Sequence, residues 1–168
     1  MPLVDALLPE FDHEMAVTRK VLERVPDGQF EWKPHQKSMS LGQLAQHVAT
    51  IPTWGKVAMS EGSYDLANDQ RPNPQGQLPT RNDILSLFDR NVSDARAALV
   101  GKGDGEMMAQ WTLKRGAHTI FSMPKASVWR SFVMNHLIHH RAQLGVYLRM
   151  HDIPLPSVYG PSADEGSL

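Results

Sequence analysis

The sequence has 168 residues, of which 41% are hydrophobic and 21% charged, and its 17 Lys and Arg against 18 Asp and Glu give a net charge of −1. This composition is typical of one globular domain, and the balanced charge excludes the basic surface of a nucleic-acid-binding or membrane-binding protein. Cysteine is absent, which excludes disulfides, thiolate ligands and a cysteine nucleophile, so any metal must be bound by imidazole or oxygen.

Two helices are predicted in the first third of the chain. Apolar residues at helical spacing indicate a helix over residues 3–25, which a Pro-Asp-Gly turn ends. A second helix is expected over residues 41–60, because Ser40 offers an N-cap and Gln43 completes a capping box. Pro52 should interrupt this helix, since it removes a backbone donor.

The rest of the chain predicts two more helices separated by long connections. Residues 61–79 are rich in Gly, Pro, Asn and Asp and indicate a loop, and a capped start at Thr80 opens a helix that runs to about residue 100. Residues 110–124 favour a short hairpin, residues 127–150 a fourth helix, and the tail from about 151 an extended structure. We therefore expect an all-α fold, a four-helix bundle formed by residues 1–168 as a single domain, with a short hairpin before the last helix.

The N-terminus has no basic start followed by an apolar run, and no apolar stretch reaches the roughly 18 residues of a membrane helix. We expect a cytoplasmic protein with no membrane partner.

Three histidines within five residues mark the fourth helix. With about 100° per residue, His136 and His140 lie on one flank of the apolar stripe, and His139 lies further from it. The spacing of four places the first two one turn apart, with Cβ atoms about 5–6 Å from each other, close enough to chelate a zinc ion together. Such a pair also occurs by chance on many helices.

A third ligand must come from another helix, and His47 is the candidate at the edge of the apolar face of the second helix. The alternative is an ordinary hydrogen-bonded histidine at the border of the core. On the fourth helix, Gln143 shares the flank of His136. Its side chain could form a hydrogen bond to a bound water or substrate, or it could make an interhelical contact. Arg141 is predicted at a surface or an interface. Trp54, Trp111 and Tyr147 could wall a pocket or belong to the core, and the remaining histidines are not expected to be ligands: His13, His35, His118 and His151.

Two segments, residues 31–54 and residues 135–165, resemble the DinB/YfiT-like superfamily of bacterial four-helix-bundle metalloproteins, and the resemblance extends over nearly the whole chain. It implies that His47, His136 and His140 bind a divalent metal, zinc or nickel, with open positions left for water or substrate. His139 belongs to the double-histidine pattern of that superfamily but is not usually a ligand, so it could support the site from outside, as could Gln143.

Relatives in this superfamily include transferases that use low-molecular-weight thiols such as bacillithiol and mycothiol. The resemblance therefore implies metal-assisted transfer of a thiol to an electrophilic small-molecule substrate, in stress or detoxification. Metal-dependent hydrolysis is the alternative, because an open metal site can also activate water.

A non-catalytic metal-binding protein that forms homodimers is a further hypothesis. On the fourth helix, Met134, Ile138 and Val146 lie off the main apolar stripe, and such a second apolar face could be buried by another copy of the chain. A nucleic-acid partner is not expected, because the sequence has no basic stripe.

Overall fold

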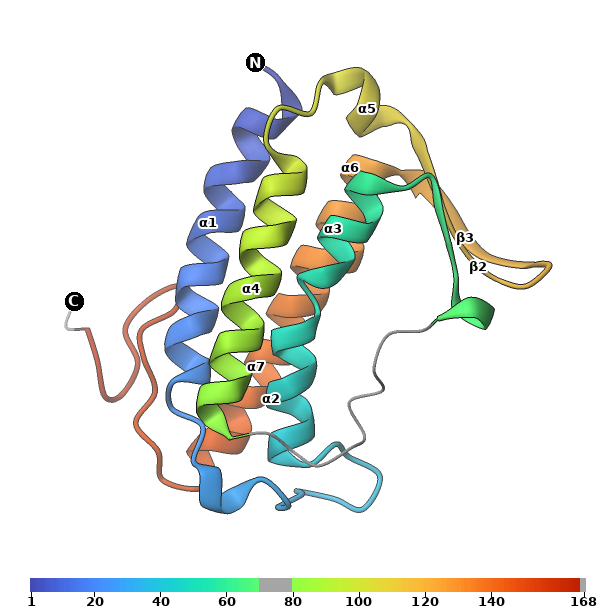
Figure 1. Cartoon of the computed structure of the whole chain (residues 1–168). Coiled ribbons are helices and arrows are strands. Elements are labelled where there is room, and N and C mark those ends of the chain that lie inside the picture. Colours follow the sequence, from blue (N-terminus) through green and yellow to red (C-terminus); the bar gives the residue numbers. More distant parts are fainter. Residues whose placement is uncertain (70–79, 167–168) are drawn as a thin grey trace.

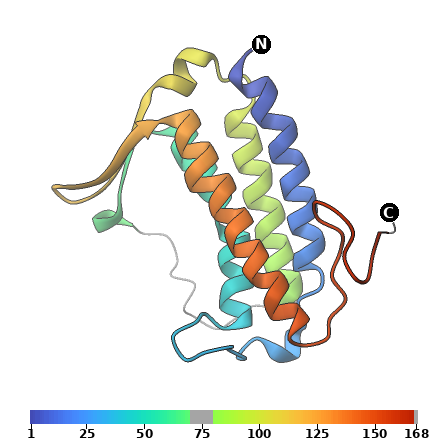
Figure 2. The ribbon, with the colours of Figure 1, turned by 180° about the vertical axis from the view of Figure 1, so that it is seen from behind.

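A bundle of long helices forms the body of the structure, a computed structural model that describes residues 1–69 and 80–166. Its main helices are α1 (Leu3–Leu22), α2 (Leu41–Thr50), α3 (Thr53–Ser60), α4 (Arg81–Leu99) and α7 (His136–Arg149). The last of them is preceded without a break by α6 (Lys125–Val128) and the π-helix η3 (Trp129–Asn135). Figure 1 and Figure 2 show α1 and α4 side by side, with α2 and α3 on the other side of α4 from α1. The last helix, α7, lies at the back of the bundle in Figure 1 and at the front in Figure 2, and it contacts both α1 and α2.

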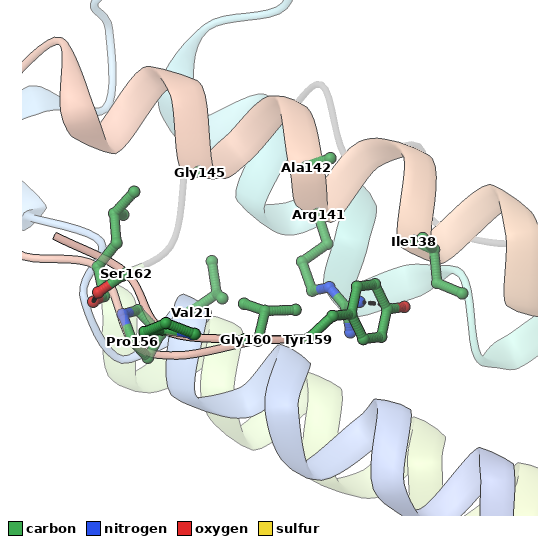
Figure 3. A pocket seen from close by; sticks show the side chains of 12 residues that line it. Val21, Ile138, Arg141, Ala142, Gly145, Pro156, Tyr159, Gly160 and Ser162 are labelled. Atoms are coloured by element: carbon green, nitrogen blue, oxygen red, sulfur yellow. Dashed lines mark hydrogen bonds between the residues drawn. The ribbon is translucent and has the colours of Figure 1, made fainter. Parts of the chain in front are cut away.

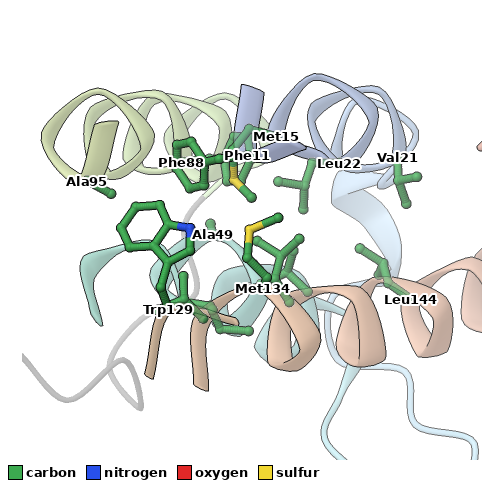
Figure 4. Packing of buried hydrophobic residues seen from close by; sticks show 14 of the residues in the cluster. Phe11, Met15, Val21, Leu22, Ala49, Phe88, Ala95, Trp129, Met134 and Leu144 are labelled. Carbon is green, nitrogen blue, oxygen red and sulfur yellow. The ribbon is translucent and has the colours of Figure 1, made fainter. Parts of the chain in front are cut away.

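The core lies where these helices face one another. Figure 4 shows Phe11 and Met15 of α1 and Phe88 of α4 directed toward Trp129 and Met134 of η3. All five side chains are at most 3% exposed. Burial of such large apolar groups supplies the main free energy that holds helices together, at about 25 cal/mol per Å².

One close approach fixes how α3 meets η3. A Cβ atom built on Gly55 would lie 2.8 Å from Cζ3 of Trp129 and 3.2 Å from Cβ of Ala95. Only glycine lets the α3 backbone come this near to the buried indole.

Two interruptions divide the helices expected from the sequence. Pro52 separates α2 from α3, as its missing N–H and ring crowding require, and the N–H of Trp54 still donates to the carbonyl of Ile51 at 3.0 Å. The second interruption, η3, was not predicted. A π-helix adds residues to each turn, and such segments are frequent at functional sites.

The predicted all-α class is wrong, because the structure contains a three-stranded mixed sheet. The expected hairpin is present as β2 (Gln110–Arg115) and β3 (His118–Pro124), which pair antiparallel. The unexpected strand is β1 (Ser63–Asp65), which pairs parallel to β2 and aligns Ser63 with Thr112. Three residues are too few to show the alternating pattern of a strand, so β1 could not be predicted from its own sequence and depends on its distant partner β2.

The sheet lies beside α3 and α6 and away from α1 in both Figure 1 and Figure 2. Three short helical elements complete the described chain: η1 (Asp27–Gln29), η2 (Leu66–Asn68) and α5 (Asp104–Met108). Of the predicted loop over residues 61–79, the first part forms β1 and η2, and residues 70–79 lie outside the described residues. Within the described ranges, no helix is both long and apolar enough to cross a bilayer.

Candidate metal centre

α2 positions the first of the three histidines. The predicted capping box is present: the N–H of Gln43 donates to Oγ of Ser40 at 3.2 Å, and the N–H of Ser40 donates to Oε1 of Gln43 at 2.9 Å. Leu44 and Val48 are buried on the core side of this helix. His47, which lies between these two residues in the sequence, is half-buried. The imidazole is therefore held at the border of the core, on a helix whose start is fixed.

α7 positions the other two. Leu137 and Leu144 are fully buried and anchor the helix, while His136 and His140 are half-buried on its flank. α2 and α7 pack against each other, which brings this flank toward His47.

The three imidazoles converge. Nε2 of His47 and Nε2 of His136 are 3.2 Å apart, and one ring nitrogen from each of the three histidines lies within 4.8 Å of the others. The ring centroid of His140 is 4.5 Å from that of His47 and 4.9 Å from that of His136. A tetrahedral ion with bonds of about 2.0–2.1 Å separates its ligand atoms by about 3.3 Å. The residues therefore fit a metal ion, and the group could hold one.

Burial keeps these rings neutral. The pKa of His47 is lowered to about 4, first by burial and then by the neighbouring His140 and His136. Burial also lowers the pKa of His136 and that of His140, while the backbone carbonyl of Phe132 opposes the first shift and the side chain of Gln143 opposes the second. A neutral imidazole is the form that binds a metal ion, so at pH 7 all three rings are available as ligands.

A family model described as the DinB family matches residues 2–166. The chain belongs to the DinB family. The resemblance seen in the sequence is confirmed.

Relatives of this DinB family member include YrdA of Bacillus subtilis, an uncharacterized protein that is 25% identical over 166 residues, which cover 96% of this chain and 91% of YrdA. Two crystal structures are similar in fold, each with a TM-score of 0.70 and 19% identity. One is the DinB-like protein YjoA of Bacillus subtilis, where the match covers 91% of this chain and 96% of that one. The other is a DinB-like protein of Bacillus cereus, with 92% and 97% covered.

Gln143 and His139 flank His140 in this DinB protein. Nδ1 of His140 and Oε1 of Gln143 are 2.7 Å apart, so the ring N–H donates to the amide oxygen and leaves Nε2 with its lone pair. This bond within one helix is neither the contact to bound water or substrate nor the interhelical contact considered from the sequence, but it is one way in which Gln143 could support the site from outside. His139 is exposed, with its ring edge-on to that of His140 at 4.8 Å, and lies outside the converging group.

The other histidines lie apart from this group. His13, His35 and His118 are exposed, and His151 packs edge-on against Trp32, with ring centroids 4.4 Å apart. Of the three aromatic candidates for a pocket wall, Trp111 is fully buried and Tyr147 also contacts Trp32. Trp54, half-buried on α3, is the one that approaches the triad, through a ring contact with Phe132. Phe132 was not predicted from the sequence as part of the site, although it lies four residues before His136.

Arg141 is not a surface or interface residue, because its side chain is only 3% exposed. It donates to Oε2 of Glu14 at 2.6 Å and to the hydroxyl of Tyr159 at 2.7 Å, and this hydroxyl donates to Oε1 of Glu14 at 2.9 Å. Figure 3 shows the guanidinium directed from α7 toward Tyr159 of the C-terminal tail. The carboxylate partner on α1 is what allows the charge to be buried.

A cavity of about 390 Å³ lies beside this ion pair, between α7, α1 and the tail. Val21, Ile138 and Gly145 line it together with Leu155 and Val158 of the tail (Figure 3). It lies on the flank of α7 that carries Arg141 rather than the histidines.

Proposed function

We propose that this DinB family member is a metal-dependent enzyme that transfers a low-molecular-weight thiol to an electrophilic small molecule. The observation that carries the proposal is the convergence of His47, His136 and His140, with one ring nitrogen of each within 4.8 Å of the others. Three neutral ligands fill three of the four positions of a tetrahedral ion, and an open position is what distinguishes catalytic from structural zinc sites.

The donor set points to zinc or nickel. Imidazole suits both ions, and the absence of cysteine removes the thiolates that would favour a structural zinc site. When bound, such a cation would act as a Lewis acid that lowers the pKa of a thiol or of water in its open position.

The roles of the protein side chains follow from their positions. The three histidines would hold the cation, and Gln143 would orient His140 by accepting its Nδ1–H. His139 could support the site from the solvent side, where its ring contacts His140. The overall reaction would form one carbon–sulfur bond, with the leaving group departing with its electron pair and the thiol proton passing to solvent. Bacillithiol and mycothiol are the thiols to be tested first.

The test begins with untagged protein purified without a nickel resin. Elemental analysis should find a stoichiometric divalent metal, and free thiol should disappear when bacillithiol or mycothiol is mixed with a panel of electrophiles. His140→Ala should lose the metal and the thiol consumption, whereas His13→Ala, an exposed histidine of α1, should keep both.

Three outcomes would contradict the proposal. Equal metal content in the wild type and a variant with all three histidines replaced by alanine would remove the site. Bound metal without thiol consumption would favour a metal-binding protein with no turnover. Metal-dependent ester or amide cleavage without any need for a thiol would favour a hydrolase.

A further inference from the structure

Four aromatic side chains from four different elements form a continuous cluster beside the histidines. We name this cluster the aromatic wall and define it as Trp54, Tyr64, Phe121 and Phe132. The ring centroid of Phe132 lies 5.1 Å from that of Trp54 and 5.3 Å from that of Phe121, and the rings of Trp54 and Tyr64 are 5.3 Å apart. These separations are in the range of favourable edge-to-face contacts.

The aromatic wall begins at the metal-binding group itself. The ring of Phe132 lies 5.9 Å from that of His136, tilted by 32°, and the ring of His136 lies 5.1 Å from that of His47. Phe132 is in η3, directly before α7, so the helical segment that supplies two histidines also supplies the first ring of the wall. Phe132 is therefore the member of the wall whose ring contacts a ring of the triad.

Buried side chains of β2 anchor the sheet, and the rings of the wall pack against that core without being fully buried themselves. Trp111 and Leu113 of β2 are at most 4% exposed and attach the sheet to the bundle, with Phe121 tilted against Trp111 at 5.8 Å. By contrast, all four members of the wall remain half-buried. Adjoining, half-buried aromatic side chains next to a candidate metal site have the composition of a small-molecule site, which is mostly apolar with a few convergent polar groups.

The charges around the wall restrict what it can bind. Its members are uncharged, the proposed metal ligands next to it are imidazoles rather than carboxylates, and the carboxylate of Asp69 accepts the hydroxyl of Tyr64 at the outer end of the wall, away from the histidines. These imidazoles would not neutralise the charge of a bound divalent cation. The cation would therefore repel a positively charged small molecule. Aromatic faces near a positive charge therefore favour a neutral, planar ring over the quaternary ammonium ions that aromatic cages otherwise bind.

We propose that the aromatic wall binds a neutral aromatic or conjugated ring of the electrophilic substrate and so places its reactive carbon at the histidine triad. This inference rests on the proposed function and names its substrate class. The hydroxyl of Tyr64 donates to Oδ1 of Asp69 at 2.7 Å, which fixes the outer end of the wall.

The binding test uses two unreactive probes of similar size, 1,3-dinitrobenzene, which is planar, and nitrocyclohexane, which is not. Phe132→Leu and the double variant Trp54→Leu/Phe132→Leu keep apolar volume but remove the rings. Each should weaken 1,3-dinitrobenzene binding by roughly three- to tenfold, the usual effect of losing an aromatic pair, and leave nitrocyclohexane binding unchanged. Trp32→Leu is the matched control, since Trp32 is also half-buried but contacts Tyr147 and His151 instead.

Two further measurements separate this inference from the proposed function. Metal affinity should be the same in Phe132→Leu and the wild type, and the planar probe should still bind when all three triad histidines are alanine. Nuclear Overhauser effects from the probe to the rings of Trp54 and Phe132 in the wild-type protein give a result that does not depend on any variant folding. Three results would each overturn the inference. The ring-removing variants could lose affinity equally for both probes, or they could bind the planar probe as well as the wild type does. The third is the absence of an Overhauser effect at the rings of Trp54 and Phe132.

Discussion

His47 lies where the apolar face of α2 meets its polar face, and this position determines both its exposure and its charge. Half-buried against α7, it has a pKa of about 4, far below that of an exposed imidazole. The sequence indicated the border position, because helical spacing separates His47 from Leu44 and Val48 by a known angle. The same spacing could not give the distance to α7, which depends on how two helices pack.

The lowered pKa values predict how the stability of the metal-free protein depends on pH. A histidine with a lower pKa in the folded state leaves the unfolded chain binding more protons, so stability is complete above the unfolded pKa near 6.5 and falls as the pH falls toward the folded value. For His47 this window extends from about 6.5 down to about 4. Chemical unfolding in the presence of a chelator should show that the free energy of unfolding decreases over this pH range.

His47→Gln should flatten this pH dependence, and His35→Gln, a change at an exposed histidine of the connector, should not. A wild-type protein whose free energy of unfolding is constant from pH 6.5 to pH 4.5 would contradict the assigned burial of the triad.

Gln143 gives a second prediction at the scale of one residue. Removing the acceptor of the His140 Nδ1–H frees this ring to rotate or change tautomer, so Gln143→Ala should lower metal affinity by roughly 10- to 100-fold, as is typical for partners of metal ligands. Competition with a chromogenic chelator measures the change. Gln143→Glu retains an acceptor oxygen and should restore most of the affinity; a glutamate variant as weak as the alanine variant would argue that Gln143 acts otherwise.

At the scale of elements, the sequence predicted local features well and departures from regular geometry poorly. The capping box at Ser40 and Gln43 and the interruption at Pro52 depend on neighbouring residues only, and both are present. The helical angles assumed a regular α-helix and placed Met134 away from the stripe that contains Val133, yet both are fully buried. The π-helix η3 turns the chain less per residue, so adjacent side chains can both face the core, and no sequence pattern marked it.

The ion pair between α1 and α7 has an energetic consequence. Glu14 and Arg141 are 5% and 3% exposed, and removing one partner of such a pair leaves the other charge buried alone. Arg141→Ala should therefore lower the free energy of unfolding by about 3–5 kcal/mol. Urea unfolding at pH 7 measures this.

Arg149→Ala is the matched control, because Arg149 also lies on α7 but forms an exposed ion pair, with Asp164 of the tail. Arg149→Ala should lower the free energy of unfolding by about 0–1 kcal/mol. If both variants lost the same stability, the buried network would not be the main link between the two helices. Replacing Glu14 and Arg141 together with methionine should recover part of the loss, since no unpaired charge remains.

At the scale of the whole molecule, the apolar face expected on the last helix is divided. Met134 is buried and Ile138 lines the cavity under the tail, but Val146 and Met150 are 61% and 57% exposed. We propose that a second copy of the chain covers this end of α7. Light scattering after size-exclusion chromatography should find a dimer, and Val146→Glu should convert it into a monomer that still binds metal.

Ile120→Glu places the same charge on an exposed apolar residue of the hairpin and should leave the dimer intact. A wild-type protein that elutes as a monomer at high micromolar concentration would rule out this homodimer.

The parallel pairing of β1 with β2 implies an order of folding. Oδ1 of Asp65 accepts the N–H of Gly116 at 2.8 Å, across 51 residues of sequence, whereas β2 and β3 are joined by a short turn. Closing a long chain segment costs more entropy than closing a hairpin, and contacts between distant residues form slowly. The helices and the hairpin can therefore form early, and β1 joins once α3 and α4 have brought its ends into place. Tyr64, the one ring that β1 adds to the aromatic wall, then reaches Trp54 among the last steps.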